Sequence, residues 1–236
     1  MLCQMCWGDE NGRKDEIKSI ATGTHGSHNR PEDIYKFAHP FGLILDIGCG
    51  DGVKMNYFKK LGTTKEVIGL DIAESILKDK PNRIYADAQY LPFKSNTFDS
   101  IICSEVLEHL PNPELCIKDI HRVLKREGFV FFSTPVLNIP FPILIPIFRK
   151  ISGAESAKVE HLHVFSTNRL CNIIDGYLEI VDIKHLGYTT IFKRLKFVKF
   201  KNFRKIVDVR LSDLSKKVSF LRYFASQIWN KCENKV

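Results

Sequence analysis

An acidic residue stands just before a glycine-rich stretch in "ILDIGCGDG", residues 44–52. Asp46 falls within a short apolar run, and Gly48, Gly50 and Gly52 follow at every second position. Glycines at such spacing let the backbone turn sharply and approach a ligand closely. A carboxylate here is unfavourable beside a phosphate and favourable beside a cation. The stretch therefore predicts a cofactor-binding loop, and the charge of Asp46 favours a cationic ligand.

Two common phosphate-binding loops do not fit this stretch. A dinucleotide fingerprint has glycine at its first, third and sixth positions, whereas the sixth position here is Val53. A valine at that position would crowd the packing of the helix against the strand. A P-loop needs Gly-Lys followed by Ser or Thr, which this stretch does not contain. S-adenosylmethionine, which carries an ammonium and a sulfonium but no phosphate, suits the loop better.

The elements that must position these residues alternate between apolar runs and helical segments. Strands are predicted at residues 43–47, 66–71, 83–86, 98–103, 129–133 and 177–186. Helices are predicted at residues 31–37, 53–61, 72–80, 112–126 and 167–175. The strand segments do not alternate polar with apolar residues, which is typical of parallel strands buried on both faces. The pattern predicts an α/β fold whose mostly parallel sheet has helices on both faces.

Four segments in this order resemble the class I S-adenosylmethionine-dependent methyltransferases, and the type 11 subfamily in particular. "ILDIGCGDG" resembles the first family motif, and "YADAQYLPF", residues 85–93, the segment after the third strand. "FDSIICSEVLEHL", residues 98–110, resembles the fourth motif, and "LKREGFVFFSTP" the turn and fifth strand. The resemblance covers residues 41–186 and implies a seven-stranded Rossmann-like sheet and a methyltransferase activity.

The resemblance also implies how the cofactor is held. Asp71 would accept hydrogen bonds from both ribose hydroxyls, and Asp87 would accept one from the adenine amino group. Ala88 would supply a backbone N–H to the adenine ring. The implied cofactor-binding residues are Asp46, Gly48, Cys49, Gly50, Gly52, Asp71, Ile72, Asp87, Ala88, Ser104 and Glu105.

Acidic residues and a histidine gather in "SEVLEHL", residues 104–110. Glu105, Glu108 and His109 are spaced i, i+3 and i+4, so a helix would place them on one face. One interpretation places Glu105 beside the methionine part of the cofactor and treats the other two as ordinary helix residues. A second makes His109 or His161 a general base or a group that orients the acceptor. The candidate catalytic residues are therefore Glu105, His109 and His161.

A third interpretation is a divalent metal site. The E-x-x-E-H string with a later histidine resembles ubiquinone-pathway and small-RNA 2′-O-methyltransferases, in which Mg²⁺ or a similar ion binds acceptor hydroxyls. Carboxylates and imidazoles are plausible ligands for such an ion. A less specific pattern, Cys3, Cys6, His25 and His28, would suit zinc. The alternative for residues 1–30 is a flexible leader.

The positive charge of the 236-residue chain is concentrated near its C-terminal end. The net charge is +8, and residues 192–236 hold thirteen Lys/Arg against three Asp/Glu. Apolar residues from Leu211 to Ile228 recur at helical spacing and predict an amphipathic helix. This tail would suit an anionic membrane surface, nucleic-acid phosphates, or packing on the sheet with solvated lysines. The antiparallel seventh strand of the family has no clear place; the stretch considered, residues 189–200, is heavily charged.

An apolar stretch, "NIPFPILIPIF" at residues 138–148, follows the fifth predicted strand, where acceptor-binding elements enter this fold. It would form a proline-broken lid, an acceptor channel or a membrane-facing lip. An odd count of seven cysteines, mostly in apolar segments, and the absence of a signal peptide predict free thiols in the cytoplasm.

Together these features predict a leader at residues 1–30, a methyltransferase domain at 31–190 and a basic amphipathic extension at 191–236. The expected reaction methylates a small-molecule or lipid-linked acceptor, on oxygen, and releases S-adenosylhomocysteine. The alternatives are an RNA methyltransferase that uses the basic tail and a non-catalytic module that binds S-adenosylmethionine. The expected location is the cytoplasm, with peripheral membrane contact through the tail as an option.

Overall fold

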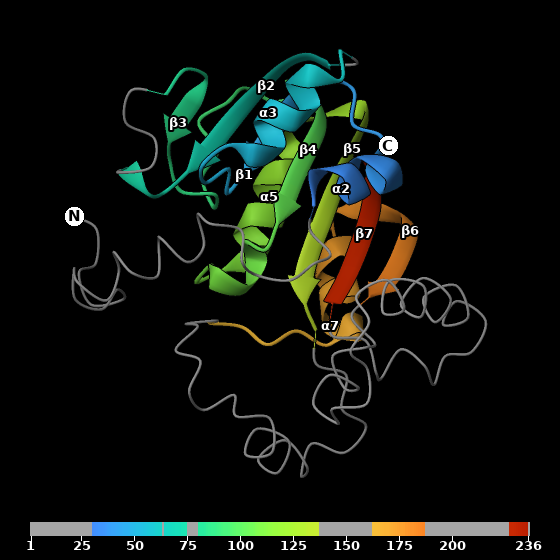
Figure 1. Ribbon diagram of the computed structural model, residues 1–236. Helices are drawn as coiled ribbons and strands as arrows, with labels where there is room; N and C mark the ends of the chain where they lie inside the picture. The colour runs from blue at the N-terminus through green and yellow to red at the C-terminus, as the bar shows by residue number, and fades with distance from the viewer. Residues whose placement is uncertain (1–29, 63, 75–79, 137–161, 187–226, 236) are drawn as a thin grey trace, which may run out of the picture.

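The computed structural model describes residues 30–62, 64–74, 80–136, 162–186 and 227–235. Seven strands of these described residues form one sheet in the order β3-β2-β1-β4-β5-β7-β6 (Figure 1). They are β1 (Gly42–Ile47), β2 (Thr64–Asp71), β3 (Arg83–Tyr85), β4 (Phe98–Ser104), β5 (Leu124–Pro135), β6 (Leu178–Leu186) and β7 (Gln227–Asn234). Neighbours among β1 to β5 pair in parallel, whereas β7 runs antiparallel to both β5 and β6. The predicted mostly parallel α/β fold is confirmed.

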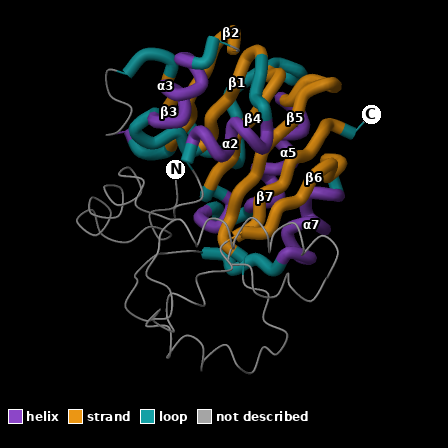
Figure 2. The backbone as a smooth tube through the Cα atoms, turned by 45° about the vertical axis from the view of Figure 1, so that its right-hand side comes forward, coloured by secondary structure: helices purple, strands orange, loops and turns teal. Residues whose placement is uncertain are grey.

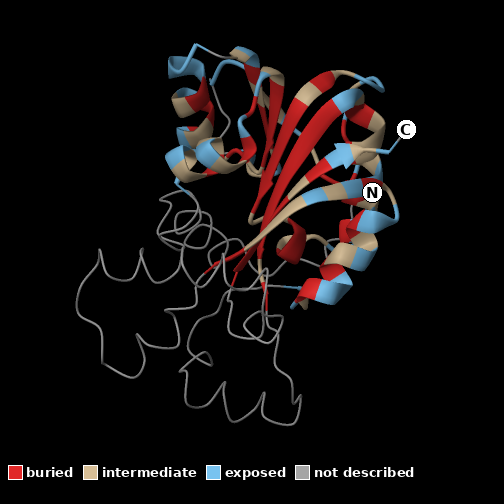
Figure 3. Cartoon of the chain, turned by 90° about the vertical axis from the view of Figure 1, so that its right-hand side faces the viewer, coloured by how far each residue is buried: buried red, intermediate tan, exposed pale blue. Residues whose placement is uncertain are grey.

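Helices lie on both faces of the sheet (Figure 2). One face packs against α2 (Pro31–Ala38) and α3 (Val53–Lys60), and the other against α5 (Pro113–Val123) and α7 (Thr167–Asp175). Ile44 of β1 belongs to the first core and its neighbour Leu45 to the second, because successive side chains of a strand point to opposite faces. Figure 3 shows the resulting burial along the central strands. Two buried faces explain why the strand segments are apolar without alternation.

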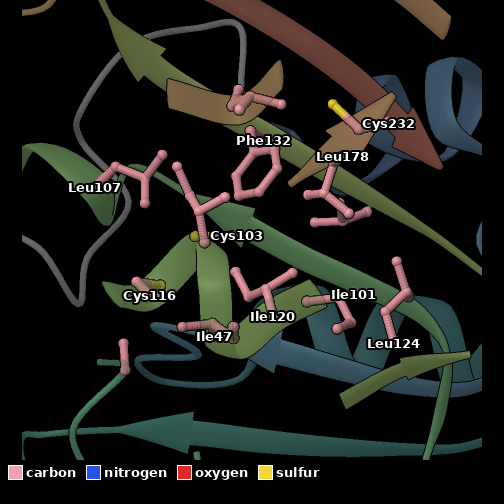
Figure 4. Close-up of a cluster of buried hydrophobic side chains, with 14 of the residues drawn as sticks. Ile47, Ile101, Cys103, Leu107, Cys116, Ile120, Leu124, Phe132, Leu178 and Cys232 are labelled. Carbon is pink, nitrogen blue, oxygen red and sulfur yellow. The ribbon is translucent and has the colours of Figure 1, made fainter. Parts of the chain in front are cut away.

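The larger core lies between the sheet and helices α5 and α7 (Figure 4). Cys103 of β4, Cys116 and Ile120 of α5, Leu178 of β6 and Cys232 of β7 are all fully buried there. Every cysteine in the described part of the chain is a free thiol. Side-chain caps begin the two helices of this layer, because Asn112 and Ser166 each accept a hydrogen bond from the backbone N–H three residues on.

The boundary between α5 and β5 differs from the prediction. The predicted helix continues to residue 126, whereas α5 ends at Val123 and β5 begins at Leu124. Leu124 has an extended backbone and pairs with Phe98 of β4, so pairing in the sheet overrides the apolar spacing that suggests a longer helix. The predicted helix at residues 72–80 lies largely outside the described residues, as do residues 1–29 and 138–148.

The seventh strand lies where the sequence predicts the end of an amphipathic helix. Ile228, the last member of that apolar series, is buried in β7 and pairs with Thr134 of β5 and His185 of β6. The placement of the seventh strand at residues 189–200 is therefore wrong. The seventh strand is β7, which lies within the segment predicted as a C-terminal extension and belongs to the sheet. The rest of the predicted amphipathic helix lies outside the described residues. No helix in the described residues is long and apolar enough to cross a membrane.

Candidate active site

The glycine loop joins β1 to α3 at the carboxyl end of the sheet. Gly48, Gly50 and Gly52 have φ values of +67°, +49° and +81°, a left-handed conformation that glycine adopts at little cost. A Cβ atom built on Gly48 would lie 2.5 Å from Cγ2 of Val106, whereas one built on Gly50 would have no described heavy atom within 4 Å. The loop is therefore tightly packed at Gly48 and open at Gly50, where a ligand could approach the backbone.

Asp46 is fully buried directly before this loop. Lys54 of α3 places its Nζ 3.4 Å from Asp46 Oδ1, within ion-pair distance, yet neither carboxylate oxygen has a hydrogen-bond partner in the described structure. Burial raises the pKa of Asp46 to about 6, and the positive charge of Lys54 limits that rise. An unsatisfied buried carboxylate is costly, so a cationic group bound beside it would recover part of the cost.

Cys49, the residue between the first two glycines, is buried and serves packing. A Cβ atom on Gly69 of β2 would lie 2.7 Å from its Sγ, so Gly69 leaves the space that the sulfur fills. Burial raises the pKa of the Cys49 thiol to about 12, which keeps it protonated near neutral pH. Cys49 therefore shapes the loop and does not supply a nucleophile.

Side chains from β2 and β3 hold the Gly50 residue of the loop. Asp71 Oδ2 accepts a hydrogen bond from Gly50 N at 2.9 Å, and its Oδ1 accepts one from Ala73 N at 3.0 Å. Arg83 Nη1 donates to Gly50 O at 2.9 Å, and Nη2 donates to Asp51 O at 2.7 Å. Arg83 is not among the residues predicted from the sequence, because a single arginine in a strand gives no signal of a contact with a distant loop.

Asp87 lies in the turn that follows β3. Gln89 donates to Asp87 Oδ1 from its backbone N at 2.8 Å, and its Nε2 lies 3.2 and 3.0 Å from the two carboxylate oxygens. Gln89 Oε1 accepts from Asn112 N at 2.8 Å, which ties the turn to the start of α5. Ala88 is buried in this turn, whereas Ile72, which follows β2, is 49% exposed. The turn is anchored by these hydrogen bonds, and Ile72 presents an accessible apolar side chain directly after β2.

The loop beyond this turn is anchored to α5 by a second set of bonds. Arg122 donates from Nη1 to Phe93 O at 2.7 Å and from Nη2 to Leu91 O at 2.9 Å. Asp119 accepts from Leu91 N and is bridged to Arg122 Nε at 2.6 Å. These bonds hold the segment that follows Asp87 and Ala88 against the helix.

Glu105 does not lie on a helix with Glu108 and His109. Its backbone N donates to Ser133 O at 2.9 Å, and its φ of +57° is left-handed, which is uncommon for a residue other than glycine. Only Leu107–His109 form a short 3₁₀ helix, η2. The predicted common helix face is therefore wrong, because the contact of Glu105 with β5 breaks the helical geometry before it can begin.

The Glu105 carboxylate is the meeting point of three strands. Its Oε1 accepts hydrogen bonds from Ser133 Oγ of β5 at 2.9 Å and from Gln227 Nε2 of β7 at 3.1 Å. Ser104 Oγ of β4 lies 2.9 Å from Ser133 Oγ, which extends the network. The residues predicted from the sequence include Ser104 and Glu105 of the fourth motif. They do not include Ser133, although it lies in the quoted fifth-strand segment, or Gln227, which lies in no motif.

Glu108 points into the interior instead. It is 1% exposed, its Oε2 accepts a hydrogen bond from Thr134 Oγ1 at 2.9 Å, and its Oε1 has no partner in the described structure. Burial and the nearby Glu105 carboxylate raise the pKa of Glu108 well above its usual value. No group of three His, Cys, Asp or Glu side chains in the described ranges is arranged to hold a metal ion.

The predicted histidines are only partly placed. His109 ends η2 and is half-buried, with its backbone N donating to Val106 O at 3.0 Å. His161 lies outside the described residues. His163 donates its backbone N–H to Glu108 O at 3.0 Å, and its Nε2 lies 3.2 Å from Pro111 O. The chain thus returns beside η2 at residue 163.

The chain resembles known proteins in the part that forms this site. Residues 45–132 match the family model described as "Methyltransferase domain". The uncharacterized protein MJ1252 of Methanocaldococcus jannaschii is 30% identical over 200 residues, which is 79% of this chain and 73% of that protein. The chain belongs to the class I S-adenosylmethionine-dependent methyltransferases. A SAM-dependent methyltransferase from Archaeoglobus fulgidus shares the fold, with a TM-score of 0.60 and 17% identity over 96% of this chain and all of that one.

Other relatives of this methyltransferase chain match over different lengths. The uncharacterized protein MJ0638 of the same archaeon is 43% identical over 89 residues, 36% of this chain and 37% of that protein. The demethylmenaquinone methyltransferase of Staphylococcus saprophyticus is 26% identical over 195 residues, 68% of this chain and 84% of that enzyme. A ubiquinone biosynthesis O-methyltransferase of Thiobacillus denitrificans is 31% identical over 102 residues, 39% of this chain and 43% of that enzyme. The chain spans only about a third of the first curated relatives that it matches.

The residues of this methyltransferase site fit S-adenosylmethionine. A buried carboxylate without a hydrogen-bond partner, Asp46, stands beside a loop whose Gly50 is open to a ligand. Asp71 ends β2 and Asp87 follows the neighbouring strand β3, as the ribose and adenine of a nucleoside would require. These three carboxylates suit a cationic nucleoside without phosphate.

Proposed function

We propose that this chain transfers a methyl group from S-adenosylmethionine to oxygen of a small-molecule or lipid-linked acceptor. The observation that carries the proposal is Asp46, a fully buried carboxylate whose oxygens have no hydrogen-bond partner in the described residues, beside a glycine loop that is open at Gly50. S-adenosylmethionine brings an ammonium that Asp46 can neutralise and a sulfonium that activates its methyl group.

The carboxylate oxygens that would hold the nucleoside can each accept a further hydrogen bond. Each oxygen of Asp71 accepts one backbone N–H, and a carboxylate oxygen can accept two hydrogen bonds. Asp71 can therefore bind ribose hydroxyls while it still supports the loop. Asp87 Oδ2 likewise accepts only from Gln89 among the bonds found, which leaves it able to accept from an adenine amino group. Ala88 and Ile72 would contact the adenine ring.

Methyl transfer asks mainly for alignment and the exclusion of water. The acceptor oxygen bonds to the methyl carbon as the carbon–sulfur bond breaks, its electron pair stays on sulfur, and S-adenosylhomocysteine leaves. A neutral hydroxyl also needs a group that takes its proton. Glu105, which Ser133 and Gln227 hold where β4 and β5 end and β7 begins, is a candidate for that role, together with His109 and His161.

The names of the relatives support the class of acceptor. One relative is named a ubiquinone biosynthesis O-methyltransferase and another a demethylmenaquinone methyltransferase, and the second aligns with 68% of this chain. Identities of 31% and 26% support a related type of acceptor without fixing the molecule.

A turnover screen tests the proposal. The purified chain is incubated with S-adenosylmethionine and with lipid, polar or RNA fractions of a cell extract, and S-adenosylhomocysteine is measured. We expect release with the lipid or polar fraction, and none from Asp46→Asn. Release with RNA alone would identify an RNA methyltransferase, and cofactor binding without release in any fraction would identify a non-catalytic module. Repeating the active fraction with EDTA, then Mg²⁺, tests the metal interpretation.

A further inference from the structure

Arg83 reaches the glycine loop from the far edge of the sheet. It begins β3, which is separated from β1 by β2, yet its guanidinium donates to two successive loop carbonyls, Gly50 O at 2.9 Å and Asp51 O at 2.7 Å. Hydrogen bonds from a charged donor are stronger than those between neutral groups, and the planar guanidinium fixes the directions of both. Arg83 therefore constrains two consecutive peptide groups at once.

The loop is shaped around this guanidinium. A Cβ atom built on Gly52 would collide with Nη2 of Arg83 and would lie 2.9 Å from its Cζ. Gly52 also has a φ of +81° and forms the N-cap of α3. The missing side chain at Gly52 thus leaves the space that Arg83 occupies, in addition to allowing the turn.

Gly50 is held from two sides. Its N–H is bound by Asp71 of β2 and its C=O by Arg83 of β3, while its Cα faces open space. Without Arg83, the Gly50 and Asp51 carbonyls would lose their partners and could turn. A loop that must be ordered at the moment of binding costs affinity, whereas a preorganised one does not.

We propose that Arg83 is a positioning residue for the donor site, which holds the Gly50 and Asp51 carbonyls so that the glycine loop is preformed for S-adenosylmethionine. The inference rests on the proposed function in one respect, that this loop binds S-adenosylmethionine. Through Arg83, β3 becomes one of the elements that form the site. The close approach of Arg83 to Gly52 links the edge of the sheet to the start of α3.

The first test measures binding of S-adenosylhomocysteine by calorimetry to wild type, Arg83→Gln, Arg83→Lys and Arg126→Gln. We expect Arg83→Gln to raise Kd about tenfold or more, because two charge-assisted bonds are lost. Arg83→Lys should recover part of the affinity, since an ammonium can reach a carbonyl but lacks the fork. Arg126, an exposed arginine in β5, is the matched control and should leave Kd unchanged.

A second readout separates positioning from general stability. Hydrogen exchange of the amides of residues 48–52 in the unliganded protein should quicken in Arg83→Gln, while exchange in β4 and β5 stays at the wild-type rate. Uniformly faster exchange across the sheet would mean that Arg83 only stabilises the fold, and would overturn the inference.

A double-mutant cycle tests the close fit between Gly52 and the Arg83 guanidinium. Gly52→Ala should weaken binding strongly in the wild-type background, where the new methyl meets the guanidinium. In the Arg83→Ser background the methyl has room, so the same substitution should cost less, and only the strain of the positive φ should remain. Equal costs in the two backgrounds would contradict the close fit on which the inference depends.

The outcomes distinguish the inference from the proposed function. Wild-type protein that binds neither S-adenosylmethionine nor its product would overturn the proposed function, and the inference with it. Tight binding by wild type with an unchanged Kd in Arg83→Gln would overturn the inference alone. If Arg83→Gln does not fold, Arg83→Lys and the Gly52 cycle decide the question on folded proteins.

Discussion

At the scale of single residues, the most informative group is the carboxyl of Asp46. Its pKa of about 6 lies above its ordinary value of 3.8, because burial penalises the charged form more than Lys54 stabilises it. Near neutral pH the protein therefore carries a buried, incompletely compensated charge at the point where a cationic ligand is expected. Binding of such a ligand should be coupled to the ionisation of this one group.

We predict that affinity for S-adenosylhomocysteine, whose ammonium needs an ionised Asp46, falls as the pH drops below about 6. The limiting slope is about tenfold per pH unit for one coupled proton. Calorimetric titrations between pH 5 and 8 measure the effect. Asp46→Asn should bind weakly and without this dependence, and a wild-type Kd that is equal at the two extremes would contradict the prediction.

Ionisation of Asp46 should strengthen ligand binding but lower the stability of the unliganded protein. Because its pKa is higher in the folded than in the unfolded chain, Asp46 favours the folded state at low pH. That contribution to the free energy of unfolding is lost as the pH rises from about 4 through about 6. Comparing urea unfolding of wild type with Asp46→Asn isolates it from the other carboxyls.

The residues that the sequence identifies share one property, since Asp46, Asp71 and Asp87 each stand in or directly after a strand. The residues that it misses reach the site from elsewhere. Gln227 lies 122 positions from the Glu105 that it contacts, and Arg83 acts on a loop more than thirty positions earlier. Contacts between distant segments depend on the order of strands in the sheet, which no local spacing encodes.

At the scale of elements, the loop after β1 is packed against the segment after β4. Gly48→Ala should lower the free energy of unfolding by about 2–5 kcal/mol, which combines a left-handed alanine with a methyl forced against Val106. Chemical denaturation measures the loss, and binding of S-adenosylhomocysteine should weaken with it.

Gly62 provides a matched control, because its φ of +68° equals that of Gly48 within a degree while its Cβ position is open in the described structure. Gly62→Ala should cost only the backbone strain, about 1–2 kcal/mol. Adding Val106→Ala to Gly48→Ala should relieve the clash. A loss from Gly48→Ala no larger than that from Gly62→Ala would show that the two loops do not press on each other.

Element types are predicted well where a segment is mostly apolar and does not alternate with polar residues, as in β1 and β4, because burial on both faces leaves a clear signal in the sequence. Prediction fails where local spacing competes with pairing in the sheet. "SEVLEHL" and the apolar series ending at Ile228 both have helical spacing, yet Glu105 contacts β5 through its backbone and Ile228 lies in β7. In both cases strand contacts satisfy backbone groups that the helix would otherwise have paired internally.

At the scale of the whole molecule, β7 joins the two parts of the sheet. It pairs with β5 on one side and β6 on the other, and its Trp229 packs against Phe131 and Phe37 with ring centroids 5.4 and 5.6 Å apart. We predict that a chain ending at residue 226 does not fold, which far-UV circular dichroism and gel filtration would show.

A chain ending after Asn234 keeps β7 and should fold normally, so it controls for shortening as such. Trp229→Ala is a milder test and should cost about 3–5 kcal/mol, as expected for loss of a buried aromatic side chain. A folded, monomeric chain ending at residue 226 would show that the sheet tolerates the loss of β7.

The order of the strands also means that two paired strands, β6 and β7, are synthesised at well-separated times. β6 is complete at Leu186, but its neighbour in the described sheet, β7, does not begin until Gln227. At typical elongation rates of about 5–20 residues per second, the ribosome needs roughly 2–8 s to cover that interval. During this time β6 exposes unpaired backbone groups while β1 to β5 can already associate. During this brief period, β6 of the nascent chain can pair with a strand of another chain.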